Sequence, residues 1–202
     1  MRRRTTAKTR PASERGAPIG EEPAVRAAYA RHGVQEFYQQ FGATYRNPHE
    51  PAVRAAIAQA IARWDLPCDH VLDLACGSGE ATLALQDLGA GTIDGIDPYT
   101  HQAYAERTGR TAERYTFEQI AAGALADRHY STIVCSFALH LAPLSRLPAL
   151  ALQLSMIGDT LLMLTPHKRP QLRPQWGWSY VDELVVQRVR ARLYRSSYDR
   201  AE

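Results

Sequence analysis

The sequence predicts an α/β fold, in which a doubly wound, mostly parallel sheet carries helices on both faces and an antiparallel strand lies near the C-terminus. Three observations lead to this prediction. From residue 67 onward, short apolar runs alternate with stretches of helical periodicity. The apolar runs are continuous, as is typical of strands buried on both faces. The first run ends in a glycine-containing turn that leads directly into a helix.

The N-terminal third of the chain has a different character. Residues 1–20 are rich in Pro, Gly, Ser, Thr and Arg, and we expect a disordered basic tail. Residues 1–18 hold six basic residues and one acidic residue, whereas the remaining chain holds 18 basic and 20 acidic residues, so the net charge of +3 comes from this tail. Such arms can bind RNA nonspecifically, although most are simply solvated. Residues 21–66 are predicted to form helices that cover the binding site, one of them running from Glu50 to about Trp64.

Residues 67–202 are predicted to form the α/β core of what we expect to be a single domain. Strands are expected at 70–75, 92–97, 115–119, 130–137 and 160–165. Helices are expected at about 79–88, 100–108 and 145–156, with a weaker helical link at 121–126. In residues 186–196, apolar residues alternate with arginines, which predicts an antiparallel strand at or near the sheet edge.

Several classes of protein are disfavoured by composition. No run of 18 apolar residues exists, and the Arg-rich start lacks the apolar stretch of a secretory signal, so we expect neither a membrane partner nor secretion. The three cysteines, Cys68, Cys76 and Cys135, have no ligand-like spacing to one another or to histidines. We therefore expect reduced thiols, a cytoplasmic location and no metal site.

The turn after the first strand holds the main functional signal. Here Asp73 and Ala75 precede Gly77 and Gly79, and the predicted helix follows at once. Glycines let the backbone approach a ligand closely, and the helix start offers unpaired N–H groups. Asp97 ends the second strand, where a carboxylate can accept hydrogen bonds from ribose hydroxyls.

The ligand class follows from two departures from the dinucleotide pattern. Thr82 stands where a third glycine would bring a pyrophosphate close to the helix, and Asp73 would repel that pyrophosphate but can orient an ammonium group. This favours a nucleoside that carries an amino acid. An NAD(P)-dependent oxidoreductase and a non-catalytic nucleotide-binding protein remain the alternatives.

With these residues, the chain resembles the class I S-adenosylmethionine-dependent methyltransferases, which have a Rossmann-like fold. The resemblance covers about residues 45–166 and rests on 71–79, 95–97 and 136–141. It implies that Gly77 and Gly79 line the methionine part of S-adenosylmethionine and that Asp97 holds its ribose. It further implies that Asp73 helps to place the amino end and that Cys135 or Ser136 lies beside the cofactor. Ala75 stands where many members have glycine.

Two features depart from the family pattern. After the third strand, where an acid often meets the adenine amino group, the sequence offers Ile120, Ala121 and Ala122. The C-terminal part also looks short, so the usual terminal hairpin is expected to be reduced to one strand.

Residues expected near the methyl acceptor follow the fourth and fifth strands. His140 and His167 are candidate general bases, because histidine titrates near neutral pH. Lys168 and Arg169 could bind an anionic acceptor, although a solvated loop is an equal interpretation. Tyr45 could close the cofactor pocket. Trp176 and Trp178 could stack on an acceptor or cover the sheet, and we favour cover.

The acceptor itself is not specified by a motif. The Asn/Asp-Pro-Pro-aromatic signature of enzymes that methylate base amino groups is absent after the fourth strand, where Ser136 and Phe137 stand. A small-molecule acceptor is therefore favoured, with RNA or protein left open.

Overall fold

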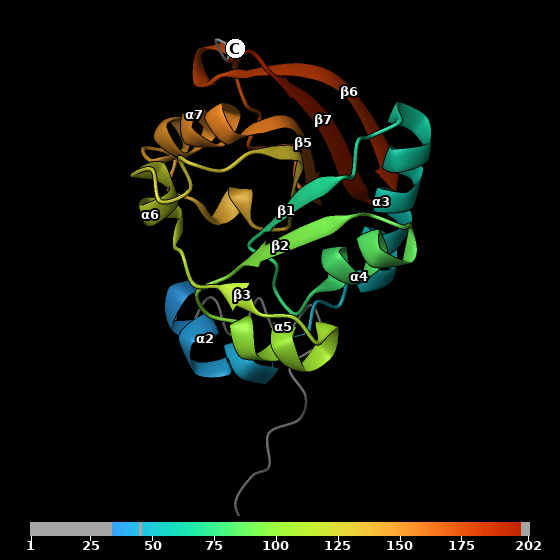
Figure 1. Cartoon of the computed structure of the whole chain (residues 1–202), viewed down its shortest axis with the longest axis vertical. Helices are drawn as coiled ribbons and strands as arrows, with labels where there is room; N and C mark the ends of the chain where they lie inside the picture. The colour runs from blue at the N-terminus through green and yellow to red at the C-terminus, as the bar shows by residue number, and fades with distance from the viewer. Residues whose placement is uncertain (1–33, 45, 199–202) are drawn as a thin grey trace, which may run out of the picture.

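The computed structural model describes residues 34–44 and 46–198 (Figure 1), so the expected basic tail and Tyr45 lie outside the described residues. The described chain forms a seven-stranded sheet in the order β3-β2-β1-β4-β5-β7-β6. Strands β1 to β5 are parallel, and β7 is antiparallel to both β5 and β6. The strands are β1 His70–Leu74, β2 Thr92–Ile96, β3 Ala112–Glu113, β4 Tyr130–Ser136, β5 Gly158–Thr165, β6 Trp178–Val186 and β7 Val189–Ser196.

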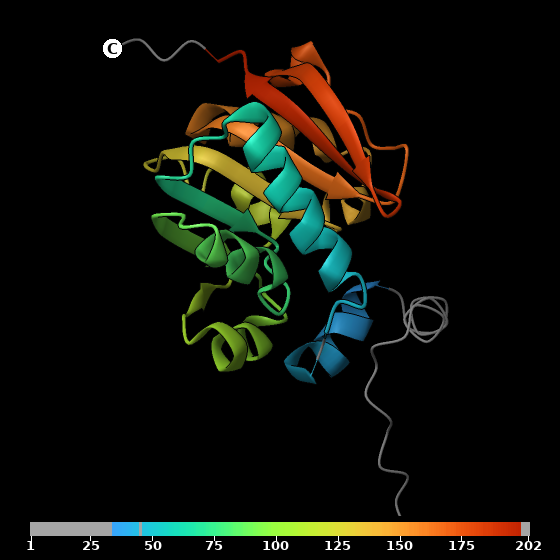
Figure 2. The same cartoon turned by 90° about the vertical axis from the view of Figure 1, so that its right-hand side faces the viewer.

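Helices cover both faces of this sheet, as the sequence predicts. They are α2 Val34–Phe41, α3 Glu50–Trp64, α4 Glu80–Asp87, α5 His101–Thr108, α6 Phe117–Ala121 and α7 Leu147–Ile157. Helix α3 lies across one face (Figure 2), where Val53 and Ile57 share a fully buried cluster with Leu193 of β7. Helix α7 packs against the other face through Leu150 and Leu154. The α/β prediction with an antiparallel C-terminal strand is confirmed.

The prediction of a third strand at 115–119 is wrong. The actual strand β3 is two residues long, Ala112–Glu113, and helix α6 occupies Phe117–Ala121 instead of the expected link at 121–126. The alternation of aromatic and β-branched residues favoured a strand, but the Thr116 hydroxyl accepts from the Gln119 N–H while the Gln119 side chain accepts from the Thr116 N–H. This capping box starts a helix and overrides the local strand preference.

The expected reduction of the terminal hairpin is also wrong, because β6 and β7 pair along their length. Strand β6 resembled a loop because it carries two acids, and both are used inside the fold. Asp182 accepts from Arg63 and Trp64 of α3, and Glu183 forms ion pairs with Arg190 and Arg192 of β7. The arginines of the 189–196 strand thus face acids on β6, and β7 lies next to the edge strand rather than at the edge.

Residues 166–177 connect β5 to β6 and contain one 3₁₀ helix, Pro174–Trp176. Arg192 is almost completely buried beneath this loop and donates to the carbonyl oxygens of His167, Lys168 and Pro170. The Glu183 carboxylate lies 2.6 Å from the Arg192 Nε, so the buried guanidinium is paired as well as hydrogen-bonded. The hydrogen bonds from Arg192 to these backbone carbonyl oxygens therefore hold the loop after β5 in place.

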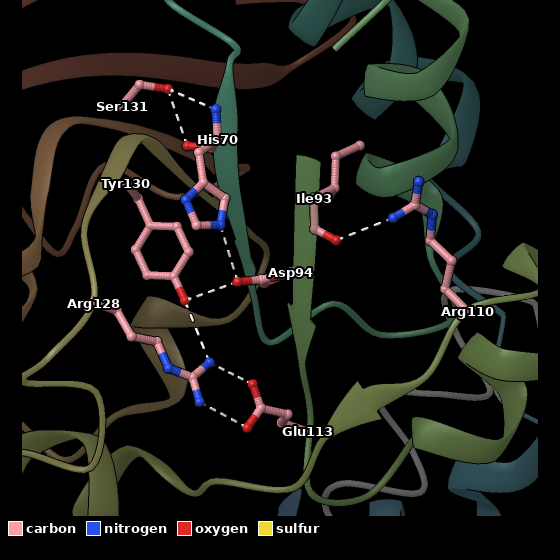
Figure 3. Close-up of polar contacts among 8 residues, drawn as sticks. All are labelled: His70, Ile93, Asp94, Arg110, Glu113, Arg128, Tyr130 and Ser131. Atoms are coloured by element: carbon pink, nitrogen blue, oxygen red, sulfur yellow. Dashed lines mark hydrogen bonds and ion pairs between the residues drawn. The ribbon is translucent and has the colours of Figure 1, made fainter. Parts of the chain in front are cut away.

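A polar network joins four strands on the face that carries α6 and α7 (Figure 3). The Asp94 carboxylate of β2 interacts with His70 Nε2 at 3.1 Å and accepts from the Tyr130 hydroxyl at 3.2 Å. Arg128 then connects Tyr130 to Glu113 at the end of β3. The side chains in this network are polar and partly exposed. They satisfy their hydrogen-bonding groups by bonding to one another, in a part of the sheet that the short helix α6 does not reach.

Within residues 34–44 and 46–198, none of the helices has the length and apolarity that crossing a membrane requires.

Trp178 should contribute more to stability than its neighbour Trp176. Trp178 is fully buried and its indole N–H donates to the Ala151 carbonyl at 2.8 Å, whereas Trp176 is half-buried beside Arg173. Trp178→Phe removes this bond and leaves a cavity, so we expect a loss of about 3 kcal/mol in the free energy of unfolding. The matched variant Trp176→Phe should lose less than about 1 kcal/mol. Urea denaturation measures both, and equal losses would contradict the role of Trp178 as sheet cover.

Candidate functional site

A cavity of about 370 Å³ lies at the carboxyl ends of β1 and β4, where the strand order reverses. Parallel sheets of this type bind ligands at such a switch point, and the volume falls in the range of about 300–1,000 Å³ that is typical of ligand pockets. The residues lining it come from the ends of β1, β2 and β4, from the segment 115–120, and from the N-terminal segment: Tyr38, Asn47, Asp73, Leu74, Ala75, Cys76, Gly77, Glu80, Ala81, Ile96, Asp97, Pro98, Tyr99, Tyr115, Thr116, Phe117, Glu118, Ile120, Ser136, Phe137, Ala138, Leu141 and Pro143.

The turn after β1 lies against the cavity in a strained conformation. Ala75 has φ = +57° and Gly77 has φ = +58°, in the left-handed region that side chains disfavour. The Cys76 N–H donates to the Ile96 carbonyl of β2, which holds the turn beneath the cavity. The left-handed φ explains why glycine is common at the position of Ala75 in the resembled family.

Asp73 lies in β1, just before this turn, and is completely buried. Its Oδ2 accepts from the Thr82 N–H at 3.0 Å and from the Thr82 hydroxyl at 2.7 Å, while its Oδ1 has no hydrogen-bond partner. Burial is the main cause that raises the pKa of Asp73 to about 7; the hydrogen bonds from Thr82 oppose this rise, and the neighbouring acids Glu80 and Asp97 add to it. A buried carboxylate oxygen without a partner, on a residue that lines a cavity, marks a place for a hydrogen-bond donor or a cation.

Asp97 serves two purposes at the end of β2. Its Oδ1 accepts from the backbone N–H groups of Tyr99 and Thr100 at 2.8 and 2.9 Å, so it holds the turn that leads into α5. Its Oδ2 accepts from the Gly77 N–H at 3.3 Å, and the residue lines the cavity. Burial raises the pKa of Asp97, while these N–H groups lower it. Asp97 therefore both holds the turn before α5 and lines the cavity.

Two of the predicted cofactor residues are not among those that line the cavity. Gly79 has φ = +90° and packs under α5, where an added Cβ would come 2.4 Å from the Thr108 methyl group. Cys135 is fully buried inside β4, and burial raises the pKa of its thiol to about 12. Gly79 thus brings α4 and α5 together, and Cys135 belongs to the core.

The end of β4 contributes Ser136 and Phe137 to the cavity. The Ser136 hydroxyl oxygen is buried and has no hydrogen-bond partner. Phe137 has φ = +57°, and its N–H donates to the Leu164 carbonyl of β5 at 2.8 Å. The His49 ring stacks on the Phe137 ring with centroids 5.0 Å apart. The Phe137 ring is therefore held in place from both the sheet and the N-terminal segment.

His140 and His167 come together, as their positions after β4 and β5 predict. Their ring centroids lie 4.7 Å apart in an edge-to-face arrangement. His140 Nδ1 is buried without a partner, and burial together with His167 lowers the pKa of His140 to about 4. His167 is exposed, and neither histidine lines the cavity, although Leu141 next to His140 does. His140 is thus neutral at physiological pH, and it directly precedes the cavity-lining Leu141 in the sequence.

One wall of the cavity escaped the sequence analysis because β3 ends earlier than expected. Tyr115, Thr116, Phe117 and Glu118 follow the true strand and line the cavity. The chain therefore does have an acid after the third strand. This acid is Glu118, which precedes the apolar segment 120–122. The pattern Thr-x-x-Gln at 116–119 was the signal that could have revealed it.

The N-terminal segment forms another wall. Tyr38 of α2 and Asn47 line the cavity, and the Asn47 N–H donates to Glu80 Oε1 at 3.0 Å. Glu80 is itself buried and pairs with Arg107 of α5. Gly42 lies so close to the loop after β2 that an added Cβ would come 2.4 Å from the Tyr99 carbonyl oxygen.

The remaining predicted residues lie farther out. Lys168 and Arg169 are exposed on the loop after β5 and do not line the cavity. Trp178 is buried under α7, which confirms that it covers the sheet.

Comparisons with known proteins agree with this geometry. A methyltransferase domain model matches residues 71–155. An uncharacterised protein of Schizosaccharomyces pombe is 31% identical, with 91% of this chain and 95% of the relative aligned. The magnesium protoporphyrin IX methyltransferase of Synechocystis with bound S-adenosylmethionine has a similar fold, with a TM-score of 0.54 at 17% identity over 87% of this chain and 96% of that one. A methyltransferase of Streptomyces caelestis has a TM-score of 0.60 at 13% identity over 79% of this chain and 96% of that one.

The chain therefore belongs to the class I S-adenosylmethionine-dependent methyltransferases. It is an enzyme that uses S-adenosylmethionine as its cofactor. The cavity fits that cofactor, because unpartnered oxygens of Asp73 and Ser136 line a space that the turn at Gly77 leaves open. The oxidoreductase and the non-catalytic alternatives are not supported.

Gly42→Ala should weaken cofactor binding without unfolding the core. The added methyl group would force α2 and its Tyr38 away from the loop after β2, where the cavity has one of its walls. We expect cofactor affinity to fall about tenfold, which corresponds to about 1.4 kcal/mol. Calorimetric titration with S-adenosylhomocysteine measures it, with the exposed neighbour variant Ala43→Ser as control. Unchanged affinity would show that the N-terminal segment does not close the site.

Proposed function

We propose that this methyltransferase acts on a small molecule in the cytoplasm. The observation that carries the proposal is the composition of the cavity wall, in which the described residues include no Lys or Arg. Nucleic-acid binding depends on cationic contacts with phosphates, and the cationic loop at Lys168 and Arg169 lies outside the cavity. The N-terminal segment, which also walls the cavity, limits the size of what can enter. Three free thiols, two of them buried, support a reducing compartment.

The cofactor is proposed to lie along the ends of β2 and β1. Asp97 Oδ2 would accept from ribose hydroxyls, since its Oδ1 is already engaged by the α5 start. The unpartnered Asp73 Oδ1 would accept from the ammonium group. Glu118, at the first turn of α6, would accept from the adenine amino group. Ala75 and Gly77 would contact the methionine part through their backbone.

The bound sulfonium supplies an electrophilic methyl group, so the protein has to align the acceptor and exclude water. The apolar and aromatic wall at Phe137, Ala138 and Leu141 would exclude water on the acceptor side. His140 is neutral and paired with the exposed His167. We propose that this pair receives the proton that the acceptor loses and passes it toward solvent. Lys168 and Arg169 would contact only the part of an acceptor that extends out of the cavity.

Transfer of a radioactive methyl group tests the proposal. The enzyme is incubated with labelled S-adenosylmethionine and either a filtered extract of small metabolites or the retained RNA and protein. We expect label in the filtered extract and none above background in the retained fraction. Label confined to RNA or protein would refute the small-molecule proposal. A variant that lacks cofactor binding, Asp97→Ala, serves as the negative control.

The pH dependence of cofactor affinity tests the role of Asp73. Below its pKa of about 7, Asp73 is mostly protonated in the free enzyme, and a bound ammonium group favours the carboxylate. Binding must then release a proton, so affinity should rise up to about tenfold per pH unit as the pH approaches about 7 and level off above it. Calorimetry with S-adenosylhomocysteine in buffers of different ionisation enthalpy measures both the affinity and the proton release.

The control for this prediction is Asp73→Asn, which keeps an oxygen for the Thr82 donors. Its affinity should be lower above pH 7 and nearly independent of pH around 7. If the variant retained the dependence of the natural enzyme, the titrating group would be another one, such as the neighbouring Asp97, whose pKa is also raised by burial.

A further inference from the structure

Which acceptors the cavity admits depends first on its charge. The charged side chains among its described lining residues are all acids: Asp73, Glu80, Asp97 and Glu118. Only Glu80 has an ion-pair partner in the described part of the chain, namely Arg107. A carboxylate or phosphate that entered this space would be desolvated beside these acids, with no Lys or Arg among the described lining residues to compensate its charge. The cavity therefore selects against anions.

The shape of the acceptor side is set by aromatic rings. Phe137 lines the cavity and is held by its N–H bond to β5 and by the stacked His49 ring. Tyr38, Tyr115 and Phe117 also line the cavity. Rings fixed in this way offer flat apolar surfaces, which bind planar ligands well.

The polar anchor on this side is Ser136. Its buried hydroxyl oxygen has no hydrogen-bond partner among the described residues, and a buried polar atom without a partner is costly unless a ligand satisfies it. Ser136 ends β4, two strands away from Asp97 at the end of β2. At about 4.8 Å per strand, this places Ser136 roughly 10 Å from the proposed ribose contact and on the far side of β1. Its position thus suits a contact with the methyl acceptor better than a contact with the nucleoside part of the cofactor.

We propose that the acceptor is an uncharged, planar aromatic molecule whose O–H or N–H nucleophile hydrogen-bonds to the Ser136 hydroxyl. This inference rests on the proposed small-molecule function. In the reaction, a lone pair of the nucleophile forms the bond to the methyl carbon while the carbon–sulfur bond breaks, and its electron pair stays on sulfur as a neutral thioether. The proton of the nucleophile leaves to solvent water, directly or through the His140–His167 pair proposed above. Ser136 orients the nucleophile and does not take the proton.

The first test identifies the class of acceptor without naming it in advance. Labelled products from the filtered metabolite extract are separated on an anion exchanger at neutral pH and monitored by ultraviolet absorbance. We expect the label in the unretained fractions and in compounds that absorb as aromatics. Label in the retained anions, or in compounds without aromatic absorbance, would overturn the inference. Label only in RNA or protein would instead overturn the proposed function.

The second test uses defined probes in matched pairs. Binding of 4-methylphenol and of 4-hydroxybenzoate to the enzyme saturated with S-adenosylhomocysteine is measured by calorimetry. We expect the uncharged phenol to bind at least tenfold more tightly than its carboxylate counterpart. Equal or tighter binding of the carboxylate would overturn the charge argument and point to Lys168 and Arg169 on the outer loop.

The third test concerns Ser136 itself. Ser136→Ala should lower the affinity for the uncharged probe and raise the Michaelis constant of the labelled acceptor by about tenfold, while S-adenosylhomocysteine affinity stays within about twofold. The exposed Ser145→Ala serves as matched control and should change none of these values. A Ser136→Ala variant that lost cofactor affinity as strongly as acceptor affinity would assign Ser136 to the cofactor and overturn the inference.

Discussion

The buried carboxyl group of Asp73 is the constraint around which the site is built. Its Oδ2 fixes Thr82 and with it the first turn of α4, so the helix must start directly behind the end of β1. The intervening turn has to close within a few residues, which forces Ala75 and Gly77 into left-handed conformations. Because that turn also carries the Gly77 N–H that meets Asp97, the ends of β1 and β2 are held together. The remaining Asp73 oxygen is left for the ligand.

Most of the fold was predictable because its signals are local. Continuous apolar strands such as 130–136 and 158–165 define a buried parallel sheet from the sequence alone. The two errors have the same cause, which is that polar or aromatic residues were interpreted without their partners. The segment 115–119 has the residue types of a strand, although Gln119 completes a capping box with Thr116. Strand β6 is hard to predict because its acids have partners on other elements: Asp182 accepts from Arg63 and Trp64 of α3, more than 100 residues away, and Glu183 pairs with Arg190 and Arg192 of β7.

The site was predictable to the extent that it lies on strand ends. Asp73, Ala75, Gly77, Asp97 and Ser136 all line the cavity, as the parallel topology requires. The sequence could not separate Gly79, which serves helix packing, from the glycines at the ligand. Nor could it find Glu80 or Asn47, whose contact joins segments 33 residues apart. Tyr45, the residue expected to close the pocket, lies outside the described residues, and Tyr38 and Asn47 form that wall instead.

The acidity of the cavity is a product of the fold and not of composition, since the whole chain carries a net charge of +3. The arginines nearest the site are used by other groups. Arg107 pairs with Glu50 and Glu80, and Arg192 is buried against Glu183 and the carbonyl oxygens of the loop after β5. A guanidinium held by backbone carbonyls and a carboxylate cannot turn toward a ligand without leaving buried acceptors unpaired. Arg107 and Arg192 are thus held by other groups, the described residues that line the cavity include no Lys or Arg, and the proposed selection against anions follows from that arrangement.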